Sequence, residues 1–193
     1  MLTITQSIPN LTFTSSAQKD TNLSFYPTVY TGTDPNFKSC ISFLQIVLPP
    51  ISKADSAQLR LAVIAKSGDD PSTVAVNRVT APFKTSDVSF STMPAFAQEK
   101  AKIAISKSDL YTIVQIDITD LVNNWLNGTY ENYGIALTNS DDSSAVQFAT
   151  NIIGYKPYYP EFLLTSSVSP VVWNKLAENG NAGSDKKDTE NVL

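Results

Sequence analysis

Apolar and polar residues alternate in short runs along the chain, which is the pattern of half-buried β-strands. The clearest run covers residues 56–65, where Leu59, Leu61 and Val63 fall on one side and Gln58 and Arg60 on the other. Clusters of Pro, Asn, Asp and Gly separate such runs and favour turns. Further strands are expected at 1–12, 38–48, 73–80, 103–105, 145–150 and 161–165. The pattern predicts an all-β protein, a jelly-roll β-sandwich with one short α-helix.

The period changes once, inside residues 112–137, TIVQIDITDLVNNWLNGTYENYGIAL. The run up to residue 118 alternates as a strand, with Asp117 on its polar side. Thr119 then suits the N-cap of a helix, because its hydroxyl can accept a hydrogen bond from the first turn. Leu121, Val122 and Trp125 lie one helical turn apart, so they predict a short amphipathic helix whose tryptophan fills the core.

Turn residues follow this helix. Gly128 suits a left-handed C-terminal cap, and Asn132 with Gly134 suits a turn into the next strand. A ligand site around Asp117, Thr119 and Trp125 is the alternative, but hydrogen bonding at the strand-to-helix junction is the interpretation that we favour. The residues expected to form this structural motif are Asp117, Thr119, Trp125, Gly128, Asn132 and Gly134.

The amino-acid composition argues against several kinds of chemistry for this chain. The 193 residues include no histidine and one cysteine, Cys40, so the commonest general base and an internal disulfide are both missing. Cys40 stands in an apolar run and is expected to be a core residue rather than a nucleophile. The net charge of −4 and the pI of about 4.7 argue against nucleic acid as a partner. We therefore expect no enzyme activity and no cofactor.

The chain ends suggest how the protein is organised and where it is found. We expect an N-terminal strand or arm at 1–15, a sandwich domain at 16–166 and a C-terminal arm with a polar tail at 167–193. The N-terminus has neither a basic region nor a long apolar core, so no signal peptide is visible and no membrane insertion is expected. The chain is therefore expected to be made in the cytoplasm.

Four motifs occur in the order found in a known bacterial family. They are LPP followed by SAQLRL (48–61), NRVTAPF with VSFSTMP (77–94), IDITDLVNNWLNGTYENYGIAL (116–137) and PEFLL (160–164). On these motifs residues 16–165 resemble the DNRLRE domain family. The literal DNRLRE string is absent, and Phe83 and Phe90 stand where the family has tryptophans. The resemblance implies a β-sandwich, usually non-catalytic, of bacterial surface or secreted proteins, with an adhesive, structural or carbohydrate-binding use. It also implies synthesis in a bacterial cytoplasm, and we expect a final location on a spore or cell surface.

Aromatic residues gather in two segments that could bind a ligand. One holds Tyr155, Tyr158 and Tyr159, and the other holds Phe25 and Tyr26. Sugar rings present apolar C–H faces to aromatic rings, so the first segment is a candidate sugar platform. Packing at the end of the sandwich, or a protein contact, is the alternative and stays open. The Asp pairs at 69–70 and 141–142 could hold calcium, but solvated turns are the favoured interpretation.

Two functions remain. The first is a self-assembling structural subunit of a surface, spore coat or appendage, whose partners are itself or other surface proteins. Strand addition by the N-terminal arm and anchoring by the C-terminal arm would make the contacts. The residues expected in these arms are Leu2, Ile4, Ile8, Val171, Val172 and Trp173. The alternative is a carbohydrate-binding module that recognises a polysaccharide, neutral rather than anionic because the chain is acidic.

Overall fold

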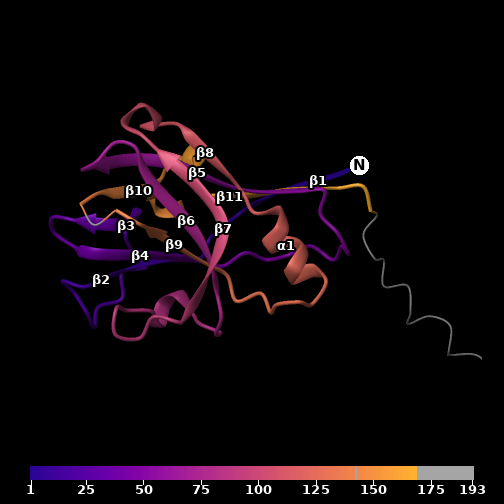
Figure 1. The fold of residues 1–193 in the computed structure, drawn as a ribbon, viewed down its shortest axis with the longest axis horizontal. Coiled ribbons are helices and arrows are strands. Elements are labelled where there is room, and N and C mark those ends of the chain that lie inside the picture. The colour runs from indigo at the N-terminus through magenta and orange to yellow at the C-terminus, as the bar shows by residue number, and fades with distance from the viewer. Residues whose placement is uncertain (142, 169–193) are drawn as a thin grey trace, which may run out of the picture.

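A computed structural model of the chain describes residues 1–141 and 143–168. Its strands form one curled antiparallel β-structure, which confirms the predicted all-β, jelly-roll-like fold (Figure 1). The strands are β1 (Leu2–Ser7), β2 (Leu11–Ser15), β3 (Thr28–Asp34), β4 (Lys38–Leu44), β5 (Ser56–Ser67), β6 (Ser72–Val79), β7 (Phe96–Ile105), β8 (Ile113–Asp117), β9 (Ile135–Asn139), β10 (Ala145–Ala149) and β11 (Glu161–Ser166).

Short helices connect some of the strands. The α-helix is α1 (Thr119–Leu126), and the 3₁₀ turns are η1 (Thr85–Asp87), η2 (Lys107–Asp109), η3 (Asn151–Ile153) and η4 (Lys156–Tyr158). None of the helices in the described part of the chain is long and apolar enough to span a bilayer. The one α-helix lies beside the sandwich and next to β7 in the projection of Figure 1.

The long strand β5 joins the two halves of the sandwich. Its first half lies between β11 and β8, with Leu59 opposite Phe162 and Ile116. Its second half pairs with β10 instead, beginning at Val63 opposite Phe148. The sheet order β1-β11-β5-β10-β3-β4-β9-β6-β7 therefore curls round a single core, with β2 added on β4 and β8 on β5.

The core lies inside this curl and is built from the alternate positions that the sequence predicts. Leu59 and Leu61 are completely buried, as are Phe13, Phe148 and Phe162. Burial of such side chains contributes about 1.5–3 kcal/mol each. Trp125 also belongs to this cluster, so the helix rests on the core through its tryptophan.

A second apolar cluster covers the outer face of β4, β6 and β9. Phe43 and Ala136 are fully buried there beneath the segment 80–95, which contributes Phe83 and Val88. The ring centroids of Phe43 and Phe83 lie 5.9 Å apart. We call this surface the covered face.

The N-terminal residues lie within the chain's own sandwich. β1 pairs antiparallel with β11, Leu2 opposite Ser166 and Ile4 opposite Leu164. β2 pairs with β4, and Ile8 between the two strands is 2% exposed. The first fifteen residues are therefore not a free arm, and their use in assembly stays a prediction. Val171, Val172 and Trp173 lie outside the described residues.

The junction before α1 differs in one detail from the prediction. The helix begins at Thr119, and the N-cap position is Ile118, without a side-chain cap. The Thr119 hydroxyl accepts a hydrogen bond from Ala57 N (2.9 Å) and donates to Asp117 Oδ1 (2.6 Å). The backbone N–H of Thr119 also donates to Asp117 Oδ1 (2.9 Å). The prediction that Thr119 is the N-cap was wrong. Its hydroxyl bonds to Ala57 of β5 instead, and Asp117 accepts from the backbone N–H of Thr119, the first free N–H of the helix.

The turns that follow α1 use their glycines as the sequence suggests. Gly128 follows the helix with φ +77°, in the left-handed region that glycine adopts without strain. Asn132 Oδ1 accepts from Gly134 N (3.1 Å), and Asn132 Nδ2 donates to Ile46 O (2.8 Å). Gly134 has φ +108°, and a Cβ there would lie 2.4 Å from Leu44 O. These contacts bring β9 close beside β4.

Candidate functional site

The tyrosines at 155–159 stand at the surface rather than in the core. Tyr155 is 54% exposed, while Tyr158 and Tyr159 are half-buried. The rings of Tyr155 and Tyr158 meet edge to face, with centroids 4.8 Å apart. This arrangement supports one ring with another and leaves part of the Tyr155 ring free.

A further tyrosine, which the sequence did not single out, joins this pair. Tyr111 lies between η2 and β8 and is 65% exposed. The Tyr158 hydroxyl donates a hydrogen bond to Tyr111 O at 3.2 Å. We call Tyr111, Tyr155 and Tyr158 the tyrosine rim.

The backbone of Tyr111 is strained. Its φ of +61° is in the left-handed region, which is uncommon for a bulky residue. Its N–H donates to Val63 O at 2.8 Å, which ties the residue to β5. Strain of this kind costs about 1–3 kcal/mol and is concentrated at functional sites. The strained backbone belongs to the turn that leads into β8, and the Tyr111 ring is exposed there.

Backbone hydrogen bonds fix the loop that carries Tyr155 and Tyr158. Tyr158 N donates to Tyr155 O, and Tyr159 N donates to Lys156 O, both at 3.0 Å. Ile8 N donates to Pro160 O at 2.9 Å, which anchors the end of the loop to the N-terminal segment. The rim is thus presented by an ordered turn, and binding a ligand would cost little additional ordering.

A row of polar side chains crosses the sheet beside the rim. Gln115 of β8 lies opposite Arg60 of β5, Arg60 lies opposite Glu161 of β11, and Glu161 lies opposite Ser7 of β1. Directly paired residues share a face of the sheet, and their neighbours Leu59 and Phe162 point into the core. The row therefore lies on the outer face. We call Ser7, Glu161, Arg60 and Gln115 the polar row, and the row with the tyrosine rim the open face.

The polar row is preorganised and almost neutral. Arg60 Nη1 donates to Glu161 Oε2 at 2.6 Å, and both side chains are about one-third exposed (27% and 32%). Asn151 Nδ2 donates to Ser7 Oγ at 3.2 Å. An ion pair of this exposure adds little stability, about 0–1 kcal/mol, but it holds donors and acceptors in place. The open face therefore offers aromatic rings beside groups that can exchange hydrogen bonds with hydroxyls.

Phe25 and Tyr26 lie in a neighbouring loop. Phe25 is 64% exposed and its ring contacts Tyr26 at 5.1 Å. Tyr26 itself packs edge to face on Phe13 of the core, with centroids 5.5 Å apart. Thr150 joins the two aromatic segments, because its hydroxyl donates to Tyr26 O at 3.0 Å just before η3. The structure thus brings Tyr26 next to Thr150, five residues before Tyr155, and ligand binding by Phe25 and Tyr26 stays a prediction.

The acidic turns use their carboxylates in local hydrogen bonds. Asp69 Oδ2 accepts from Ser143 Oγ (2.6 Å), Asp70 Oδ1 accepts from Lys107 N (2.9 Å) and Asp141 Oδ2 accepts from Thr73 N (3.3 Å). Within 1–141 and 143–168, no three His, Cys, Asp or Glu side chains gather as metal ligands would. Asp142 is outside the described residues.

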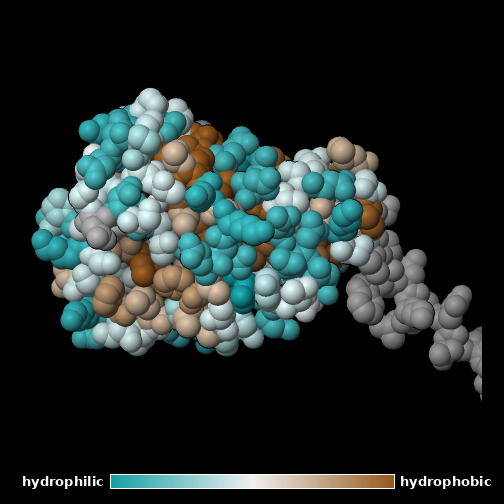
Figure 2. Space-filling model, viewed as in Figure 1, coloured by the Kyte–Doolittle hydropathy of each residue, from teal (hydrophilic) through white to brown (hydrophobic). Residues whose placement is uncertain are grey.

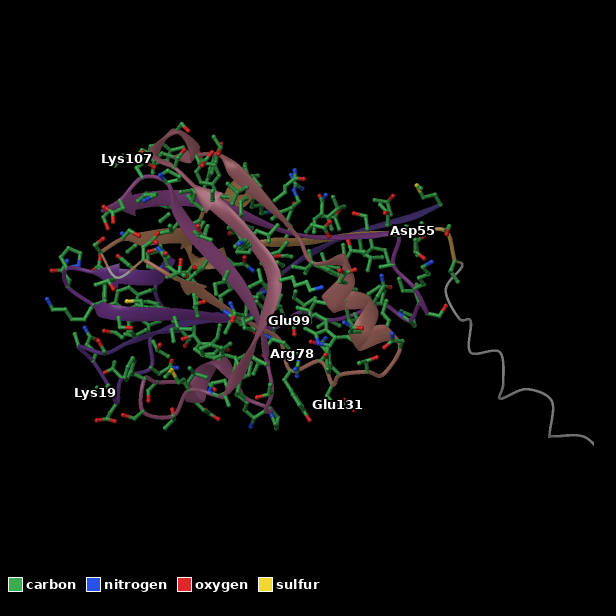
Figure 3. All side chains as sticks on the ribbon, in the orientation of Figure 1. Lys19, Asp55, Arg78, Glu99, Lys107 and Glu131 are labelled. Carbon is green, nitrogen blue, oxygen red and sulfur yellow. The ribbon has the colours of Figure 1, made fainter. Side chains whose placement is uncertain are left out.

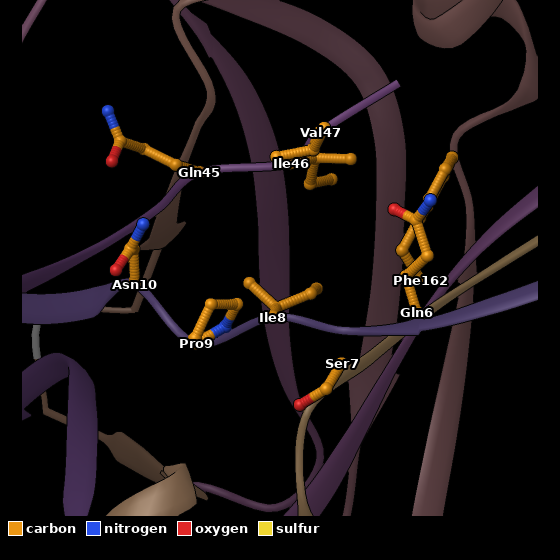
Figure 4. A pocket seen from close by; sticks show the side chains of 9 residues that line it. All are labelled: Gln6, Ser7, Ile8, Pro9, Asn10, Gln45, Ile46, Val47 and Phe162. Carbon is orange, nitrogen blue, oxygen red and sulfur yellow. The ribbon is translucent and has the colours of Figure 1, made fainter. Parts of the chain in front are cut away.

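The structure also holds a buried thiol and a small cavity. Burial, with the charge of Asp34, raises the pKa of the Cys40 thiol to about 12, so the thiol stays protonated and unreactive at neutral pH. A cavity of about 40 Å³ lies between residues 6–10 and residues 45–47, where Ile8 and Phe162 line it (Figure 4). It has room for a water molecule, but not for a sugar ring.

Aromatic rings beside hydrogen-bonding side chains, on the outer face of a β-sandwich, suit the apolar faces and the hydroxyls of sugar rings. A comparison with family models agrees: carbohydrate-binding module family 96 matches residues 4–159. The chain belongs to this family, whose members are non-catalytic binding modules. The match begins at residue 4 rather than 16, so it includes most of β1 and all of β2. A search of curated proteins found no match.

The sequence could predict two members of the tyrosine rim but not the third. Tyr155 and Tyr158 attract attention because they stand together with prolines. Tyr111 stands alone in the sequence, 47 residues before Tyr158, and only the pairing of β8 with β5 brings it to the rim. The one sequence feature that points to Tyr111 is the presence of a bulky aromatic residue in a polar turn, SKSDLYT.

Proposed function

We propose that this chain binds a neutral polysaccharide through its open face. The observation that carries the proposal is the tyrosine rim, where Tyr111 and Tyr155 are more than half exposed and Tyr158 holds both segments together. The rings pack against the apolar faces of sugars, and the polar row exchanges hydrogen bonds with their hydroxyls. Membership of a carbohydrate-binding family supports the same function.

The charge of the open face favours a neutral ligand. Arg60 is already paired with Glu161, so neither provides a free charge for a carboxylate or sulfate. The whole chain carries −4, which repels polyanions at long range. Specificity then depends on ring stacking and on hydroxyl geometry.

Affinity electrophoresis in native gels tests this function. The gels contain hydroxyethylcellulose, glucomannan, xylan or mixed-linkage β-glucan, with alginate as an anionic comparison. We expect at least one neutral polymer to retard the wild-type chain and the double variant Tyr111→Ala/Tyr155→Ala to lose the retardation. Tyr155→Phe, which keeps the ring, should be retarded like the wild type. Retardation by alginate alone, or equal retardation of the double variant, would contradict the proposal.

One observation favours self-association as a second function. β1 lies at one edge of the sheet, and its residues LTITQS carry neither charge nor proline. Exposed edges usually carry lysine, proline or a bulge that prevents pairing with another chain. Two copies could therefore pair through β1.

Light scattering across a concentration series tests this second function. Thr3 is exposed on β1, and Thr3→Lys places a charge on the edge without removing core residues. The association is expected to weaken in this variant. A wild-type monomer at all concentrations would refute self-association and leave polysaccharide binding untouched.

A further inference from the structure

A polar groove of about 640 Å³ lies between β7 and α1, away from the tyrosine rim. One wall is formed by residues 99–102 of β7 and the other by residues 117–124 of the β8–α1 junction and the helix. Tyr130, which follows the helix, completes the lining. Figure 2 shows hydrophilic side chains gathered over this region of the molecule. The volume is in the usual range for ligand sites, about 300–1,000 Å³.

A bulge in β7 shapes the first wall. Gln98 lies opposite Asn77 and Lys102 lies opposite Ala75, so three residues of β7 face the single residue Val76 of β6. Residues 99–101 therefore have no regular one-to-one partners in β6, and this irregularity bends the strand. Bulges of this kind redirect side chains and are common beside binding sites.

An ion pair and a stacked ring fix the end of the groove. The Arg78 guanidinium lies over the Tyr130 ring, 3.8 Å from its centroid. Arg78 Nε also donates to Glu99 Oε1 at 3.1 Å, and both side chains are only about one-fifth exposed (19% and 21%). Figure 3 shows Arg78 and Glu99 next to each other near β7. Tyr130 N donates to Asn124 O at 3.1 Å, which ties the tyrosine to the helix.

The remaining lining groups balance in charge. Lys100 and Lys102 supply two cations, and Asp117 and Asp120 supply two anions. Asp117 uses Oδ1 to accept from Thr119, which leaves Oδ2 for a ligand. Neighbouring donors and acceptors without net charge match hydroxyl groups, because each hydroxyl can donate and accept at once. The groove thus suits a neutral polyhydroxylated ligand.

Asp117 connects the groove to the open face. On β8 it lies opposite Gln58, on the same side of the sheet as Gln115, and it also lines the groove. Asp117 is two positions after Gln115 on the strand, so their backbones lie about 7 Å apart. A ligand that crosses the polar row at Gln115 therefore reaches the mouth of the groove by following β8.

We propose that the groove is an extension subsite that binds further sugar units of the neutral polysaccharide held at the open face. This inference rests on the proposed function and adds a direction to it: the chain runs from the tyrosine rim along β8 toward Tyr130. Long oligosaccharides should then bind more tightly than short ones, because only they reach both places.

Isothermal titration with cello-, manno- and xylo-oligosaccharides of two to six units tests the subsite. For the series that binds, we expect the hexasaccharide to bind at least about tenfold more tightly than the trisaccharide. The double variant Asp120→Asn/Lys102→Gln, at two exposed positions, should lose this gain and keep the trisaccharide affinity. Tyr130→Phe should keep the gain, whereas Tyr130→Ala should reduce it.

The control is Asp87→Asn/Lys84→Gln, the same change at exposed positions in and beside η1, which should behave as the wild type. Equal affinity for trisaccharide and hexasaccharide in the wild type, or a full gain in the groove variant, would overturn the extension subsite while the open face remains. If no neutral oligosaccharide binds the wild type at any length, the proposed function and this inference fail together.

Discussion

The covered face and the open face are two outer surfaces of the same sandwich that differ in burial. On the covered face, Phe43 is completely buried beneath the segment 80–95, and Asn22 Nδ2 holds that segment through Thr85 O (2.7 Å) and Val88 O (2.8 Å). On the open face, Arg60 and Glu161 remain about one-third exposed, and the tyrosine rim stands at its border. One sheet surface is closed by its own chain, whereas the other is left to solvent.

The difference separates residues that stabilise the fold from residues available for binding. The covered face gains stability through apolar burial. The open face gains little, because an ion pair that is about one-third exposed contributes about 0–1 kcal/mol and Tyr111 adds strain. Under the proposed function, the exposed rings of the tyrosine rim serve a ligand rather than the fold. Changes on the covered face should then lower stability, and changes on the open face should lower affinity.

Phe43→Ala should have the largest effect. Removing a fully buried phenylalanine leaves a cavity and costs about 3–5 kcal/mol of unfolding free energy. Urea denaturation followed by fluorescence measures the change. Where the variant is folded, its affinity for the polysaccharide should equal that of the wild type. A loss below about 1 kcal/mol would mean that the covering segment contributes little to the fold.

Cys40 should report on the same difference through its labelling rate. With its pKa raised to about 12, the buried thiol reacts with a thiol reagent at pH 8 only when the chain opens. Phe43→Ala is expected to accelerate labelling roughly a hundredfold or more, in line with the lost unfolding free energy. Tyr155→Ala should leave the rate unchanged. Fast labelling of the native wild type would show that β4 is not protected as described.

Tyr155→Ala should weaken binding and leave stability almost unchanged, which is the opposite of what Phe43→Ala should do. Because the ring is 54% exposed, its loss should change the unfolding free energy by less than about 0.5 kcal/mol. The affinity for the bound polysaccharide should fall at least about tenfold, as expected for an aromatic anchor. Calorimetric titration and thermal unfolding of the same sample measure both. Unchanged affinity would remove Tyr155 from the binding surface.

Arg60→Gln should have the smallest effect on affinity of the open-face changes. The pair with Glu161 is partly exposed, so its loss should cost no more than about 1 kcal/mol. Affinity should decrease several-fold because the polar row loses a fixed donor. Lys84→Gln, exposed before η1, is the matched control for the removed charge. A variant with full affinity would restrict the binding surface to the tyrosine rim.

The local features of the fold could be predicted from the sequence because they depend on neighbours in the chain. The strand leading to Asp117, the helix with Trp125 and the turns at Gly128 and Gly134 each follow from residues a few positions apart. Features that depend on distant pairings could not. β7 was predicted only at 103–105, because the bulge at 99–101 interrupts its alternation, yet the strand runs from Phe96 to Ile105.

The candidate site shows the same limit. Tyr155 and Tyr158 could be predicted from their clustering, whereas Tyr111 and the polar row required the register of β8, β5, β11 and β1. The alternation that identifies Arg60 as outward-facing could not show that Glu161, 101 residues later, lies beside it. Sequence patterns indicate which side of a strand a residue occupies, but not which residue is opposite.

Chemical-shift mapping of the ¹⁵N-labelled chain, titrated with the neutral oligosaccharide that binds most tightly, shows which of the two faces holds the ligand. The largest amide shifts should fall at Tyr111, Gln115, Arg60 and Tyr155, with residues 80–95 unaffected. Shifts concentrated in residues 80–95 and absent from the tyrosine rim would rule out binding at the open face and move the ligand to the covered face.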